Sequence, residues 1–110
     1  PGSESAVNEA PAANAAQAER ARHVSEEEDA SAFRYARLLI SEIKLYHEDA
    51  VHEGRRDGNL LERLGPEIAR ARSLYEEHVP AEVRSRTDHF GQELVRTLAN
   101  GNPRLLGQAT

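Results

Sequence analysis

The chain has 110 residues, 38% of them hydrophobic and only 5% aromatic, so it is large enough for one small domain with little apolar area to bury. The absence of cysteine excludes disulfides as a source of stability, and the formal net charge of -5 argues against a general polyanion-binding protein. No stretch of the sequence is apolar enough to span a membrane. Small domains of this kind commonly need a partner chain to complete their core, and we therefore expect a homodimer.

Residues 1–24 differ in composition from the rest of the chain. They are rich in alanine, glutamate, asparagine and glutamine, contain no aromatic residue, and have no apolar stripe wider than alanine methyl groups. We expect this segment to be a disordered linker or a frayed helix. Pro1-Gly2-Ser3 has the form of a remnant left by protease cleavage of an expression tag, which suggests a domain cut from a longer protein.

Residues 25–56 carry the strongest pattern in the sequence. Ser25 and Glu28 form a capping box that predicts the start of a helix, and the Asp-Gly-Asn sequence at 57–59 predicts its end. Between them, residues spaced three and four apart form an apolar seam with one histidine, which is typical of a helix that packs on another helix. We expect this seam to contact both the rest of the domain and a second copy of the chain. Its residues are Phe33, Ala36, Ile40, Ile43, Tyr46, His47 and Ala50.

Two further helices are expected after this stop. Asn59 is placed to cap a helix over residues 60–78, which the Gly-Pro pair at 65–66 should bend. Pro80 indicates the first turn of a third helix, which ends near Gly101. Apolar residues at helical spacing follow both helices and the tail: Leu61, Leu64, Ile68, Ala71 and Tyr75, then Val83, Phe90, Leu94 and Leu98, and finally Leu105 and Leu106, which we expect to fold back on the core.

The sequence contains no arrangement of residues typical of a catalytic centre. His47 and His52 resemble a metal-binding pair, but they are five residues apart, which places them about 140° from a shared helix face. His47 is better explained as a polar seam residue that sets register or partner choice. We therefore expect no enzyme activity, no metal and no cofactor.

Five arginines of the second and third helices form a candidate basic strip: Arg70, Arg72, Arg84, Arg86 and Arg96. Such a strip would bind nucleic acid or an acidic partner. Glutamates interleave with these arginines, and some lie four residues away, as on an ordinary solvated helix face. Nucleic-acid binding is therefore the alternative interpretation and not the main one.

Several segments within residues 32–107 carry a resemblance to known proteins: the run Ala-Arg-Leu-Leu-Ile-Ser-Glu-Ile-Lys-Leu-Tyr at 36–46, then 79–80, 83–84, 87–90 and 94–96. Together they resemble a helical module found at the C-terminal ends of multidomain proteins of myxobacteria, other deltaproteobacteria and acidobacteria. Some of those proteins carry an N-terminal zinc ribbon, whose cysteines are not present here. The resemblance implies a bacterial cytoplasmic protein with an appended domain, and it implies no activity.

We conclude from the sequence that residues 25–110 form an all-α domain, a small antiparallel bundle of about three helices that dimerisation completes. The expected function is that of a non-enzymatic oligomerisation or protein-docking module at the C-terminal end of a larger bacterial protein. The alternative is a nucleic-acid-associated regulatory domain that uses the arginines between Arg70 and Arg96.

Overall fold

The structure, a computed structural model, describes the backbone of residues 2–108 and the side chains of residues 14–108. It contains helices α1 (Gly2–Tyr46), α2 (Glu48–Asp57), α3 (Leu60–Arg63), α4 (Gly65–His78), α5 (Ala81–Arg86) and α6 (His89–Glu93), followed by a π-helix (Leu94–Leu98) and a 3₁₀-helix (Pro103–Leu106). No strand occurs within the described backbone. The predicted all-α fold class is therefore confirmed.

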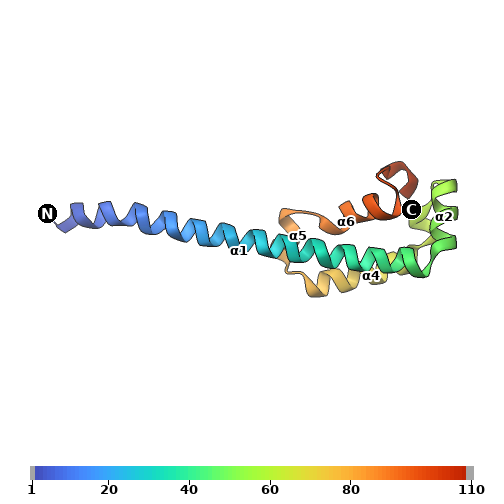
Figure 1. Cartoon of the computed structure of the whole chain (residues 1–110), viewed down its shortest axis with the longest axis horizontal. Helices are drawn as coiled ribbons and strands as arrows, with labels where there is room; N and C mark the ends of the chain where they lie inside the picture. Colours follow the sequence, from blue (N-terminus) through green and yellow to red (C-terminus); the bar gives the residue numbers. More distant parts are fainter. Residues whose placement is uncertain (1, 109–110) are drawn as a thin grey trace.

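The helices form a compact body around one half of a much longer helix (Figure 1). α4 runs back along α1 in the opposite direction, and α6 with the π-helix lies along another side of α1. α2 and α3 close the end of the body, while the first half of α1 projects away from it. The molecule consequently measures 74 Å along its long axis and only about 22 Å across.

α1 begins well before residue 25, where we predicted the start of the first helix. The helix passes through the expected capping box without interruption, and Ser25 lies within it, half-buried. Of the two alternatives that we predicted for residues 1–24, a disordered linker or a frayed helix, the alanine-rich sequence favours the helix, because alanine has the highest helix propensity. The side chains of residues 14–24 are all exposed, so this part of α1 is helical without a buried face. Pro1, within the expected tag remnant, and residues 109–110 lie outside the described residues.

The predicted continuous helix to residue 56 is also wrong, because the chain turns at His47. This residue has φ -132° and ψ 44°, and a separate helix, α2, starts after it. Glu48 and Asp49 in the first turn of α2 suit the positive end of its dipole. The turn brings Val51 to 2% exposure in the core. The sequence around His47 does not indicate this turn, because the turn is stabilised by the burial of Val51 against residues distant in the sequence.

The end of α2 follows the prediction, whereas the expected cap by Asn59 does not form. Gly58 ends α2 in the left-handed conformation at φ 67°, which glycine adopts without strain. Asn59 makes no side-chain cap, because its Oδ1 accepts a hydrogen bond from Arg63 Nε at 2.9 Å. The predicted bend near residue 65 is present as the division between α3 and α4.

The predicted third helix is divided in two at residues 87–88, and Asp88 caps its second half by accepting from the Gly91 amide at 3.0 Å. Pro80 precedes the first turn of α5 as the N-cap residue, one position earlier than expected. At the end of the π-helix, Arg55 of α2 donates to the carbonyl oxygens of Leu98 and Thr97 at 2.7 and 3.0 Å. Arg55 thus satisfies carbonyl groups at a helix end that have no partner within the helix.

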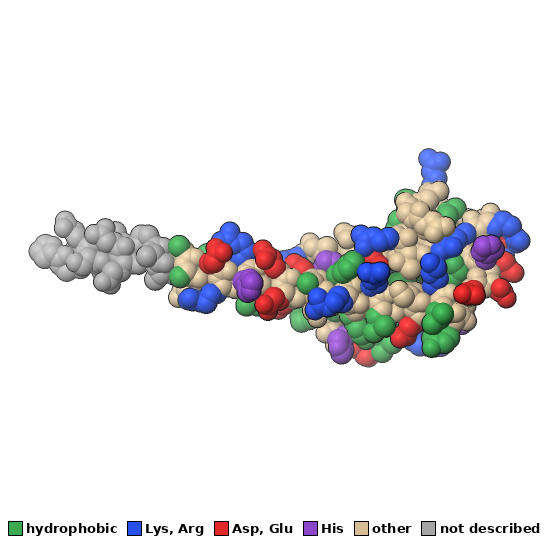
Figure 2. Space-filling view, in the orientation of Figure 1, with side chains coloured by type: hydrophobic (Ala, Val, Ile, Leu, Met, Phe, Trp, Pro, Cys, Tyr) green, Lys and Arg blue, Asp and Glu red, His purple; other side chains and the backbone are tan. Residues whose placement is uncertain are grey.

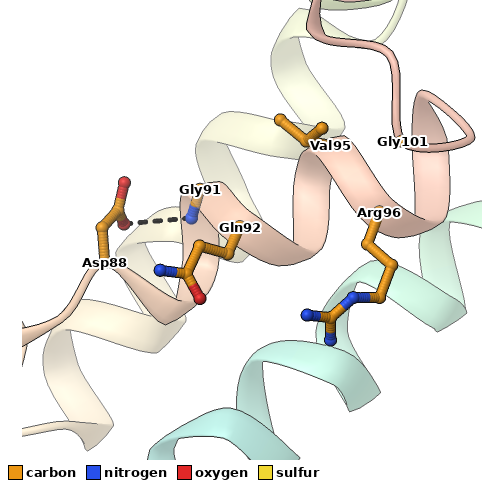
Figure 3. A pocket seen from close by; sticks show the side chains of 6 residues that line it. All are labelled: Asp88, Gly91, Gln92, Val95, Arg96 and Gly101. Atoms are coloured by element: carbon orange, nitrogen blue, oxygen red, sulfur yellow. Dashed lines mark hydrogen bonds between the residues drawn. The ribbon is translucent and has the colours of Figure 1, made fainter.

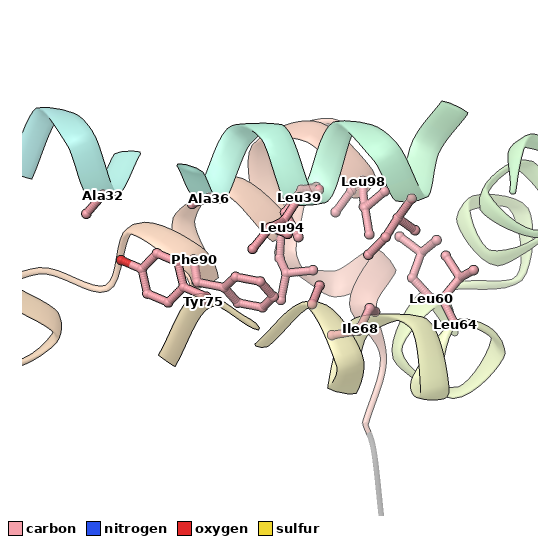
Figure 4. Packing of buried hydrophobic residues seen from close by; sticks show 14 of the residues in the cluster. Ala32, Ala36, Leu39, Leu60, Leu64, Ile68, Tyr75, Phe90, Leu94 and Leu98 are labelled. Atoms are coloured by element: carbon pink, nitrogen blue, oxygen red, sulfur yellow. The ribbon is translucent and has the colours of Figure 1, made fainter. Parts of the chain in front are cut away.

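The core lies between α1, α4 and the segment from α6 onward (Figure 4). The third predicted seam is confirmed, since Val83, Phe90, Leu94 and Leu98 are each at most 3% exposed. In the second predicted seam, Leu61 is only partly buried, whereas the preceding residue Leu60, which the prediction did not include, is fully buried. Leu105 and Leu106 pack against the core as expected. Each fully buried leucine or phenylalanine contributes about 1.5–3 kcal/mol through the removal of apolar surface from water.

Tyr75 is buried in this core at 3% exposure, with its ring 5.5 Å from that of Phe90. Its hydroxyl group has no hydrogen-bond partner among the described residues. Burial raises the pKa of Tyr75, because the tyrosinate anion would lose its hydration.

Candidate functional site

Three of the residues predicted to form a dimer interface are already covered by their own chain. Ala36 and Ile40 are 0% exposed and Ile43 is 6% exposed, all within the core cluster. A residue without accessible surface offers nothing to a second copy in this conformation. These three residues lie on the face of α1 that packs on α4, α6 and the π-helix of the same chain.

The other predicted interface residues differ in their surroundings. Phe33 is half-buried, with the His89 ring 6.5 Å from its centroid and the Arg96 guanidinium 5.5 Å from it. Ala50 is partly buried against the core. Tyr46 is 74% exposed, and His47 is exposed at the turn between α1 and α2. The structure therefore does not bring these residues together as one free surface.

The outer face of α1, opposite its buried face, is an exposed surface. At its edge, Val24, Glu27 and Ser31 also line a depression with the body segment around Val79 and Pro80. Leu38 and Leu45 are 53% and 64% exposed on this face, and Val24 is 53% exposed where the helix leaves the body. Leu38 lies two residues after the buried Ala36, about 200° around the helix, so the two residues face opposite ways. The sequence signal that we missed is the spacing of Val24, Leu38 and Leu45 in multiples of seven.

We call this surface the outer seam and define it by eight residues whose spacing alternates between four and three: Arg20, Val24, Glu27, Ser31, Arg34, Leu38, Ser41 and Leu45. All eight are exposed. The visible part of the projecting helix carries acidic and basic side chains interspersed (Figure 2). The outer seam is thus a heptad stripe of three apolar residues, three charged residues of both signs and two serines.

Four of the five arginines of the predicted basic strip contact other groups of the chain. The Arg72 guanidinium lies 4.6 Å from the centroid of the Phe90 ring, while Arg70 lines a different surface, between α1 and α4. Arg84 donates to the Val79 carbonyl oxygen at 3.0 Å. The remaining two arginines make ion pairs: Arg86 with Glu28 and Asp29 at 3.3 and 3.6 Å, and Arg96 with Glu93 at 2.8 Å.

A small depression of about 170 Å³ lies between α1 and α4. Leu39, Ile43 and Ala71 line its apolar part, while Tyr46 and Leu74 are its well-exposed apolar residues. One oxygen of Glu67 there is buried without a hydrogen-bond partner among the described residues. This depression is a second, smaller apolar surface on the body.

A wider, open depression of about 600 Å³ follows α6 and the π-helix (Figure 3). Asp88 lies at one end of it, where its carboxylate is occupied in capping α6. The guanidinium of Arg96 points from it toward α1. Glu93 beside it is 1% exposed and accepts from Arg96 and from Thr97 Oγ1 at 2.8 and 3.1 Å. The polar groups are turned to the protein, and they do not converge on a substrate position.

Within the described part of the chain, no group of three or more histidine, aspartate or glutamate side chains is arranged to hold a metal ion. Over the same residues, none of the helices combines the length and the apolar character that crossing a membrane requires. Comparisons with protein-family models, curated proteins and solved structures find no match to the chain. The arrangement of its own residues is therefore the basis for a functional proposal.

Proposed function

We propose that this chain is a non-enzymatic self-association module that dimerises through α1. The observation that carries the proposal is the half of α1 that projects from the body (Figure 1), whose side chains from residue 14 to residue 24 are all exposed. Isolated helices are marginally stable in water, and most helices in proteins are stabilised by packing. A partner on the exposed apolar residues of this helix would supply that packing.

The proposal differs from the sequence-based hypothesis in the face that it uses. The inner seam is buried within the chain, whereas the outer seam exposes Val24, Leu38 and Leu45. Nucleic-acid binding, the alternative, has weaker support because four of the five candidate arginines are held by protein groups. Docking of a different protein on the same outer face is the outcome expected if the chain does not self-associate.

Pairing of two copies would raise the effective concentration of any domains attached to them. On the resemblance to the C-terminal modules of bacterial multidomain proteins, we propose that the attached domains belong to such a protein, acting in the cytoplasm. The charged seam has few apolar residues, so the association should be weak and should decrease as salt screens its ion pairs.

The test is the solution mass of the complete chain, measured by light scattering after size exclusion over a concentration series. One chain has a mass of 12.2 kDa, and the proposal predicts a rise toward twice that value with concentration. Leu38→Lys should suppress the rise, because it places an ammonium group in the centre of the outer seam. Leu74→Lys is the matched control, since Leu74 is 41% exposed on α4, away from that face. A mass of one chain at all concentrations would refute self-association.

A further inference from the structure

We propose that two copies of this chain pair antiparallel through their outer seams, about a twofold axis that passes close to Ser31. This inference rests on the proposed self-association and adds the orientation, the register and the residues in contact. It concerns the outer seam alone, because the opposite face of α1 is filled by the body.

Two of the three apolar residues of the outer seam are symmetric about Ser31, whereas the third, Leu45, faces the position of Gln17 in the partner subunit. Val24 lies seven residues before Ser31 and Leu38 lies seven residues after it. A twofold axis at Ser31 reverses the order of the second helix, so each Val24 faces Leu38 of the partner subunit. Ser31 itself, small and exposed, meets its own symmetry copy and allows the two helices to approach closely.

The charged residues obey the same symmetry. Glu27 lies four residues before Ser31 and Arg34 three residues after it, so each faces the other across the axis within about one residue. Arg20 and Glu42 lie eleven residues before and after Ser31, and Glu42 borders the outer seam. The antiparallel pair therefore gains two Glu27–Arg34 contacts and two Arg20–Glu42 contacts. Self-complementary patches of this kind are the requirement of a twofold interface.

A parallel pair in register makes the opposite contacts. Each residue then faces its own copy, which places Glu27 against glutamate and both Arg20 and Arg34 against arginine. Like charges at close range destabilise a helix pair and select against that partner or orientation. The charge pattern thus favours the antiparallel arrangement on two grounds, through the attraction that it gains and the repulsion that it avoids.

The antiparallel pair also gives the projecting half of α1 a place to pack. Residues before Ser31 in one copy lie beside residues after Ser31 in the other, where the outer face of the partner's helix is exposed. Opposed helices that overlap from about residue 16 to residue 46 remain in contact along roughly 46 Å. The projecting segment is then the arm that one copy lays on the other.

Charge reversal tests the register. In a concentration series by analytical ultracentrifugation, Glu27→Arg should weaken the dimer by about tenfold or more, since each of two attractive contacts becomes repulsive. The double variant Glu27→Arg, Arg34→Glu should restore the affinity to within about threefold of the original. Glu26→Arg is the matched control. Glu26 is the residue next to Glu27 and is also exposed, but it points away from the outer seam. Circular dichroism of each variant confirms that the helix content is unchanged.

The orientation is measured separately by pulsed electron paramagnetic resonance. The chain has no cysteine, so Lys44→Cys gives one exposed attachment point for a spin label. The antiparallel pair places the two labelled positions about 26 residues apart along the helices, or roughly 39 Å, whereas a parallel pair places them at the same level. A distance near the longer value, with the predicted response to charge reversal, supports the proposal.

Three results overturn it. A short distance between the labels, or a Glu27→Arg variant that dimerises as the original does, refutes this register but does not refute self-association. A chain that stays monomeric at every concentration removes both this inference and the proposed function. The same measurements therefore distinguish the register of the dimer from self-association itself.

Discussion

The side chain of Arg55 connects α2 to the end of the π-helix, more than 40 residues later in the chain. We predict that Arg55→Met destabilises the fold although it changes no apolar contact of the core. Methionine keeps most of the apolar stem of arginine and removes the guanidinium. The carbonyl oxygens of Leu98 and Thr97 then lose the donors that lie 2.7 and 3.0 Å from them.

The magnitude follows from these two contacts. A hydrogen bond that involves a charged group has a net value of about 1.5–3 kcal/mol, and partial exposure of Arg55 lets water replace some of it. We therefore expect a loss of about 2–3 kcal/mol for the pair of bonds. In a domain of this size, each kcal/mol corresponds to about 4–8 °C in Tm.

The assay is urea denaturation followed by circular dichroism, with wild type and variants at one protein concentration. Arg56→Met is the matched control, because the neighbouring Arg56 is exposed and its side chain bonds only to Asp57 in the described structure. An exposed pair of that kind contributes little to stability, because water screens the charges. Equal unfolding midpoints for Arg55→Met and the original chain would refute the role assigned to Arg55.

Three further substitutions test the core, a close helix contact and the pH dependence. Tyr75→Phe should leave stability unchanged or raise it by about 1 kcal/mol, because it removes a buried hydroxyl without a partner. The pKa of Tyr75 is raised in the folded state, so the unfolded chain loses the phenol proton at a lower pH than the folded chain does. The free energy of unfolding should therefore fall as the pH rises above 10.0, and in urea denaturation Tyr75→Phe should show a smaller fall. Gly54→Ala gains about 1 kcal/mol of helix propensity, but overpacking costs about 1–3 kcal/mol, so thermal melts should show a net loss. The added Cβ would lie 2.6 Å from Leu60 Cδ2 and 3.2 Å from Leu60 Cα. Hydrogen bonding from Arg56 lowers the pKa of Asp57. The ionised Asp57 therefore stabilises the fold above pH 3.8, and this stabilisation is lost as the pH falls through the lowered pKa. Asp57→Asn should lessen the loss of stability in acid, and an unchanged dependence of stability on acid pH would contradict this.

The all-α class and most of the core were predictable from the sequence because they depend on local periodicity. Residues three and four apart share a helix face, so the buried positions of Ala36, Ile40, Phe90 and Leu94 follow from spacing alone. The stop at Gly58 was predictable for a similar reason, since the left-handed conformation at a helix end favours glycine.

Periodicity does not identify the partner of a helix face. Only the tertiary structure shows which segment covers it. The sequence indicated that the inner face of α1 needed a cover and could not tell a second copy from α4 and α6 of the same chain. The break at His47 depends on the burial of Val51, and the contact of Arg55 joins segments distant in the sequence. Once the body had covered the inner face, the outer seam remained as the free surface, because one face of a helix can pack while the opposite face stays in water.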